Sequence, residues 1–114
     1  MAGEKGLLGG SIELMILSLL ETEDCYGYQM VKRLEEKSNA VFQMKEGTLY
    51  PLLHRMENKG YLASYEKEAE NGKKRKYYRL TASGKRQLAT EKEQWHTFTT
   101  AVNHVIGGKA YGMV

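Results

Sequence analysis

The chain has 114 residues, of which 41% are hydrophobic and 27% charged, and its formal net charge is +3. This length predicts a single domain, and the balance of apolar and charged residues excludes an intrinsically disordered chain. No apolar run approaches the roughly 20 residues that cross a bilayer, and the first residues lack a signal-peptide pattern. We therefore expect a cytoplasmic protein with no membrane partner.

Positive charge is concentrated in one segment of the chain. Residues 73–86 contain seven lysines and arginines and no acidic residue, whereas the rest of the chain holds ten basic and fourteen acidic residues. A concentrated basic segment predicts contact with a polyanion such as nucleic acid. A solvated face without a partner is the alternative interpretation.

The first predicted element is a helix that follows two glycines and has Ser11 as its N-cap. Residues 1–8, before it, are expected to form a loose arm, and an acidic turn over residues 21–24 ends it. Its apolar residues recur at intervals of three and four, which predicts one buried face formed by Ile12, Met15, Ile16, Leu19 and Leu20.

A second helix is predicted from about residue 26 to 38, with Met30, Val31 and Leu34 facing inward. Residues 40–43 are predicted to pair as a short strand. Cys25 is the only cysteine, so an intrachain disulfide and a cysteine-cluster zinc site are excluded. Because nothing near it in the sequence lowers its pKa, we expect a structural thiol rather than a redox sensor.

A third helix is predicted over residues 46–59, and Gly60 is expected to stop it as the C′ glycine. Its buried stripe consists of Leu49, Leu52, Leu53 and Met56. A helix with one packed face and one polar face can enter the major groove of DNA. Candidate DNA contacts therefore lie at its start and on its other face: Lys45, Thr48, Tyr50, Pro51, His54 and Arg55. An ordinary surface helix is the alternative, although Tyr50 then has no evident role in folding.

A hairpin follows, with strands over residues 61–67 and 76–80 and a turn at residues 70–73. Basic side chains at its tip can contact phosphates, a contact that carries little sequence information; they are Lys73, Lys74, Arg75 and Lys76. Thr81 is then expected to cap a last helix that ends near residue 106, with its hydroxyl close to the amide of Gly84. Residues 108–114 are expected to be a frayed tail.

This order of elements predicts a mostly α (α+β) fold: a winged helix-turn-helix with a two-stranded β-wing and a long C-terminal dimerisation helix. Residues 1–80 would form the DNA-binding domain, and residues 81–107 the dimerisation helix, which belongs to the same compact domain.

Three sequence runs resemble the PadR family of transcriptional regulators. They are EGTLYPLLHRMENKGYL over residues 46–62, KRKYYRLTASG over residues 74–84 and Tyr26-Gly27-Tyr28. The resemblance covers about residues 8–106, and the first two runs together are specific to the family. It implies a homodimer, usually a repressor, on a palindromic operator, and it implies DNA contact by Thr48, Tyr50 and the wing lysines. The single C-terminal helix is similar to that of the short-chain branch of the family.

The last helix carries an apolar stripe that one copy of the helix cannot bury, namely Leu88, Trp95, Phe98, Val102 and Val105. The stripe predicts a homodimer interface. The position of Trp95 resembles that of a tryptophan which, in some multidrug-sensing members, faces its twofold mate across a flat cavity. Two interpretations stay open: an interface anchor, or a stacking surface for a planar aromatic effector.

The sequence thus predicts a sequence-specific regulator of transcription that binds double-stranded DNA and needs no cofactor or metal. An enzyme is not expected, because His54, His96 and His104 lack metal-ligand spacing and no phosphate loop or nucleophile motif is present. The remaining alternative is a winged-helix module for protein–protein contacts without DNA binding, against which the basic segment argues.

Overall fold

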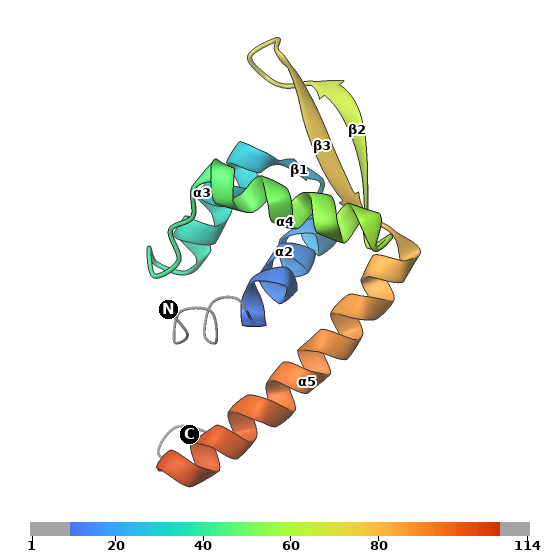
Figure 1. Cartoon of the computed structure of the whole chain (residues 1–114). Coiled ribbons are helices and arrows are strands. Elements are labelled where there is room, and N and C mark those ends of the chain that lie inside the picture. The colour runs from blue at the N-terminus through green and yellow to red at the C-terminus, as the bar shows by residue number, and fades with distance from the viewer. Residues whose placement is uncertain (1–9, 108–114) are drawn as a thin grey trace.

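Three helices, a hairpin and a long final helix follow one another in the computed structural model, which describes residues 10–107 (Figure 1). The helices are α2 (Gly10–Thr22), α3 (Gly27–Lys37), α4 (Glu46–Asn58) and α5 (Ala82–Ile106), and the strands are β1 (Cys25–Tyr26), β2 (Leu62–Glu68) and β3 (Lys74–Leu80). The expected fold class, a mostly helical winged helix-turn-helix, is confirmed. The expectations of an N-terminal arm and of a frayed tail over residues 108–114 concern parts of the chain outside the described residues.

The sheet has three antiparallel strands in the order β1-β3-β2. Strand β1 adds to the two predicted strands of the hairpin and pairs with β3, so that Cys25 lies opposite Tyr78 and Tyr26 opposite Tyr77. The prediction of a strand over residues 40–43 is wrong: that segment is irregular, and it follows a turn in which Asn39 and Ala40 have φ values of 53° and 67°. Two consecutive residues in the left-handed region turn the backbone sharply and prevent the extended path that strand pairing needs.

Helix α2 is the most buried helix, because it packs against α3, α5 and β3. Its first residue is Gly10, so Ser11 lies inside the first turn and is buried, and the prediction of Ser11 as the N-cap is wrong. The predicted apolar face is buried, apart from a half-buried Met15. Leu17 is buried as well, although it lies outside that face, since the helix has neighbours on more than one side.

Helix α4 ends as predicted, at a glycine. Gly60 has a φ of +86°, and the N–H groups of Gly60 and Tyr61 donate to the carbonyls of Glu57 and Met56. This pair of bonds is a Schellman motif, which satisfies carbonyls that the helix end leaves open. The same corner begins α5: the Thr81 hydroxyl accepts a hydrogen bond from the Gly84 amide, at 2.9 Å, as predicted.

The hairpin and α5 leave this corner in opposite directions (Figure 1). The first turns of α5 pack against α2, where Lys92 Nζ lies 3.2 Å from Glu21 Oε1. Beyond that point the helix extends away from the other elements, and its residues are mostly exposed. Between residues 10 and 107, no helix is both long and apolar enough to cross a membrane.

Candidate nucleic-acid interface

Helix α4 presents two different faces. Its stripe of Leu49, Leu52, Leu53 and Met56 is buried in the core, as predicted. All six residues of the predicted DNA-contacting set are exposed: Lys45, Thr48, Tyr50, Pro51, His54 and Arg55. Pro51 lies inside the helix on this exposed side. The packed stripe holds the helix in place and leaves the polar face open, as a helix that enters a major groove requires.

Tyr50 also has a packing role that the sequence did not reveal. A methyl group placed on Gly27, the first residue of α3, would lie 2.5 Å from the Tyr50 hydroxyl oxygen and 2.7 Å from Cζ. The ring therefore rests on the backbone of α3 although the residue is 43% exposed. Burial is the main cause that raises the pKa of Tyr50, followed by the Glu46 carboxylate. The hydroxyl therefore stays protonated at neutral pH and can donate a hydrogen bond.

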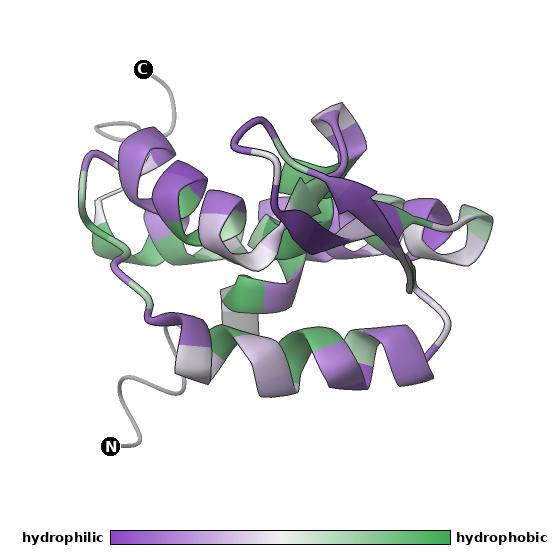
Figure 2. Cartoon of the chain, turned by 90° about the horizontal axis from the view of Figure 1, so that it is seen from above, coloured by the Kyte–Doolittle hydropathy of each residue, from purple (hydrophilic) through white to green (hydrophobic). Residues whose placement is uncertain are grey.

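The hairpin places its four basic residues in different environments. Lys73 and Lys74 are exposed at the tip, and neither ammonium group forms an ion pair with another described residue. Arg75 is half-buried, with its guanidinium 5.3 Å from the centre of the Tyr26 ring. Lys76 Nζ lies 3.9 Å from Glu57 Oε1 of α4. Figure 2 shows the hairpin as largely hydrophilic. Of these four residues, the side chains of Lys73 and Lys74 have no ion pair or ring contact with another described residue.

Strand pairing brings acidic residues against this basic strand. Glu66 lies opposite Lys76, and Glu68 lies opposite Lys74. Opposite charges at facing positions stabilise a hairpin and weaken its positive potential. The count over residues 73–86 missed this effect, because the acidic partners belong to the preceding strand.

One face of the sheet carries a cluster of aromatic rings. Tyr77 lies between Tyr26, whose ring is edge-on at 5.3 Å, and Tyr65, whose ring is stacked at 5.7 Å. The Tyr65 hydroxyl donates a 2.5 Å hydrogen bond to Asp24 Oδ2. This bond is the main cause that raises the pKa of Tyr65 to about 12. The cluster joins the hairpin to β1 and to the turn before it.

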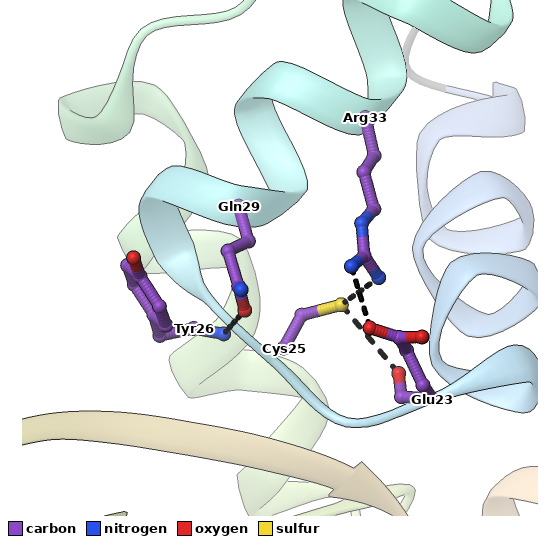
Figure 3. Close-up of polar contacts among 5 residues, drawn as sticks. All are labelled: Glu23, Cys25, Tyr26, Gln29 and Arg33. Carbon is purple, nitrogen blue, oxygen red and sulfur yellow. Dashed lines mark hydrogen bonds and ion pairs between the residues drawn. The ribbon is translucent and has the colours of Figure 1, made fainter. Parts of the chain in front are cut away.

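Cys25 lies in a polar corner at the start of α3 (Figure 3). Arg33 Nη1 donates to its Sγ at 3.0 Å, and Arg33 Nη2 lies 2.5 Å from Glu23 Oε2. Burial is the main cause that raises the pKa of the Cys25 thiol; Glu23 and Asp24 also raise it, and Arg33 lowers it. The thiol is fully buried and protonated at neutral pH, which matches the structural role expected of it.

The predicted interface residues of α5 fall into two groups. Trp95, Phe98, Val102 and Val105 are exposed, by 44%, 59%, 36% and 85%. Leu88 is 2% exposed and packs in the core of its own chain. Its assignment to the interface is corrected for this reason: α2 and the sheet already cover it.

The matching family model and two similar solved structures name one family. Residues 16–90 match the Transcriptional regulator PadR-like family. Protein X of Lysinibacillus sphaericus is 36% identical over 89 residues, which cover 78% of this chain and 82% of the relative. The crystal structure of a PadR-like transcriptional regulator from Bacillus cereus has a TM-score of 0.81 and 34% identity, and the match covers 90% of this chain and 98% of that one. A PadR family transcription regulator from Clostridium difficile has a TM-score of 0.74 and 38% identity, with 85% and 99% covered.

Proposed function

This chain belongs to the PadR-like family of transcriptional regulators, and we propose that it is a repressor that binds a palindromic operator as a homodimer. Membership implies DNA binding, and members of the family are regulators rather than enzymes. Family membership does not by itself give the repressor role, the dimer or the palindromic operator, which we propose in addition.

The observation that carries the proposal is the division of α4 into a buried stripe and an exposed polar face. We assign base contacts to this face, with Arg55 and His54 reaching base edges and Thr48, Tyr50 and Lys45 contacting bases or phosphates beside Pro51. The tip lysines Lys73 and Lys74 contact the phosphate backbone. Sequence choice then rests with α4, and the wing contributes affinity that depends on salt.

A second copy of the chain is the proposed partner of α5. The exposed residues Trp95, Phe98, Val102 and Val105 recur along one side of the helix, and burying them against another copy is favourable. A twofold dimer presents two α4 helices, and half-sites one helical turn apart, roughly 34 Å, would match them.

Trp95 supports a further proposal, that a planar aromatic effector releases the repressor. Trp95 is 44% exposed, and its ring lies 6.0 Å from that of Phe98, centre to centre. Two such pairs facing each other in a dimer would offer flat apolar surfaces on which an aromatic ligand can stack.

Fluorescence anisotropy with a labelled duplex from the region upstream of the protein's own gene tests the function. A scrambled duplex is the control, at about 50 and 200 mM salt. Salt-sensitive binding that prefers the upstream duplex by about 10³-fold or more is the expected result. Binding to neither duplex at low salt would contradict the proposal and favour a protein-interaction module.

A further inference from the structure

Glu57 lies near the C-terminal end of α4 and contacts both strands of the wing. The Ser64 hydroxyl of β2 donates a 2.6 Å hydrogen bond to Glu57 Oε2. Lys76 Nζ of β3 lies 3.9 Å from the other carboxylate oxygen, Oε1. The side chain of Glu57 is only 29% exposed, so these contacts are partly shielded from water.

The strand register explains why both contacts reach the same carboxylate. Ser64 is paired with Tyr78, and Lys76 lies two residues before Tyr78 on the same strand. Side chains at such positions point to the same face of a sheet, and here that face looks toward α4. Along the chain, the wing is joined to α4 only by the short turn at residues 59–61.

Lys76 is engaged more fully than the lysines at the tip. Besides Glu57, it lies opposite Glu66 on β2, and its ammonium is 5.4 Å from the centre of the Tyr78 ring. The Glu57 carboxylate and the Tyr78 ring reduce the positive charge that this ammonium offers to a phosphate. Lys74 has only Glu68 opposite it and extends from the exposed tip.

We infer that Glu57 is a positioning residue that sets the angle of the wing to α4, and that Lys76 serves as its partner instead of contacting a DNA phosphate. The inference rests on the proposed DNA-binding function. It corrects the interpretation of the basic segment as a uniform set of phosphate contacts. Two carboxylate oxygens that hold two strands restrict the rotation of the wing more than either contact alone.

The salt dependence of binding by the full-length chain separates the two kinds of lysine. Removing one phosphate contact reduces the slope of log K against log salt by about 0.9. We expect Lys74→Gln to reduce the slope by about this amount per protomer and Lys76→Gln to leave it unchanged. An equal reduction by both variants would overturn the inference, because Lys76 would then contact a phosphate.

The second readout is the ratio of affinities for the upstream and the scrambled duplex. Glu57→Ala is expected to lower this ratio about tenfold. Glu57→Gln, which keeps an acceptor for Ser64, is expected to have an affinity ratio closer to that of the wild type. A wild-type ratio in Glu57→Ala, or an equal decrease in affinity for both duplexes, would contradict the role of Glu57.

Hydrogen exchange measured without DNA tests the positioning role of Glu57 separately from the proposed DNA-binding function. Glu57→Ala is expected to speed amide exchange in β2 and β3 and to leave α2 and α3 protected, which also shows that the variant folds. Unchanged exchange in the strands would overturn the positioning role even if DNA binding had failed. A wild-type chain with no preference for any duplex would count against the proposed function alone.

Discussion

At the scale of single residues, Gly27 and Tyr50 form one unit although they lie on different helices. Gly27 has no side chain in the space that the Tyr50 ring occupies, since a Cβ there would approach the hydroxyl oxygen to 2.5 Å. The ring of Tyr50 is thereby held against the start of α3. A DNA-contacting residue that is held in advance loses less conformational entropy on binding.

The variant Gly27→Ala is expected to reduce affinity for the operator about tenfold while changing the free energy of unfolding by less than about 1 kcal/mol. The added methyl displaces only the far end of a half-exposed ring, so the fold tolerates it. Anisotropy and urea unfolding measure the two effects. In a Tyr50→Ala background the substitution should have no further effect on binding. The same tenfold reduction in both backgrounds would show that Gly27 acts by another route.

At the scale of elements, the wing is held by contacts on both of its faces. Glu57 contacts one face through Ser64 and Lys76, and the aromatic cluster around Tyr77 covers the other. The bond from Tyr65 to Asp24 extends this second set of contacts to the turn before β1. A two-stranded hairpin alone is marginally stable in water, so these contacts are what keep the wing in one orientation.

The Tyr65–Asp24 bond predicts a dependence of stability on pH. Because the folded-state pKa of Tyr65 is raised to about 12, its contribution is complete below the ordinary pKa near 10 and is lost as the pH rises toward 12. We expect Tyr65→Phe to lower the free energy of unfolding by about 1 kcal/mol near pH 8, and by progressively less above pH 10. Urea unfolding at several pH values measures this difference. Tyr61→Phe is the control. If Tyr65→Phe lowers the free energy of unfolding by the same amount up to pH 12, the Tyr65–Asp24 bond is not the cause of the difference.

The sequence predicted those elements whose signals are local. The stripe of α4, its end at Gly60 and the cap at Thr81 follow from spacing and from residue type within a few positions. The contact of Tyr50 with Gly27 joins residues distant in sequence, which no local pattern reports, and the acidic partners of the wing depend on the register of the hairpin. The incorrect prediction for Leu88 has a similar cause. Leu88 fits the heptad spacing of α5, but it is buried by α2 and the sheet, which its spacing does not report.

At the scale of the whole molecule, the polar face of α4 and the exposed apolar residues of α5 lie toward different ends of the molecule (Figure 1). The exposed face of α4 and the wing tip are polar, whereas the distal part of α5 exposes Trp95, Phe98, Val102 and Val105. These ends diverge from the corner at residues 59–61 and 81 (Figure 1). Association through α5 would therefore leave both copies of α4 free to bind DNA.

The variant Phe98→Glu is expected to convert the proposed dimer into a monomer, since it places a charge in the apolar contact. Val41→Glu is the matched control, because Val41 is an exposed apolar residue, at 72%, in the loop before α4. Sedimentation velocity should give the control about twice the 13.0 kDa of one chain and Phe98→Glu about that of one. A dimeric Phe98→Glu, or a monomeric wild type, would contradict the role of α5.

Hydroxyl-radical footprinting of the wild-type chain on its upstream DNA tests whether two α4 helices bind a palindrome. A dimer that inserts one α4 from each copy should protect two symmetry-related segments whose centres lie one helical turn apart, about 10 base pairs. Arg55→Ala should weaken protection of both segments together. A single protected segment, or even protection along the whole duplex, would contradict the account of two α4 helices that read a palindrome.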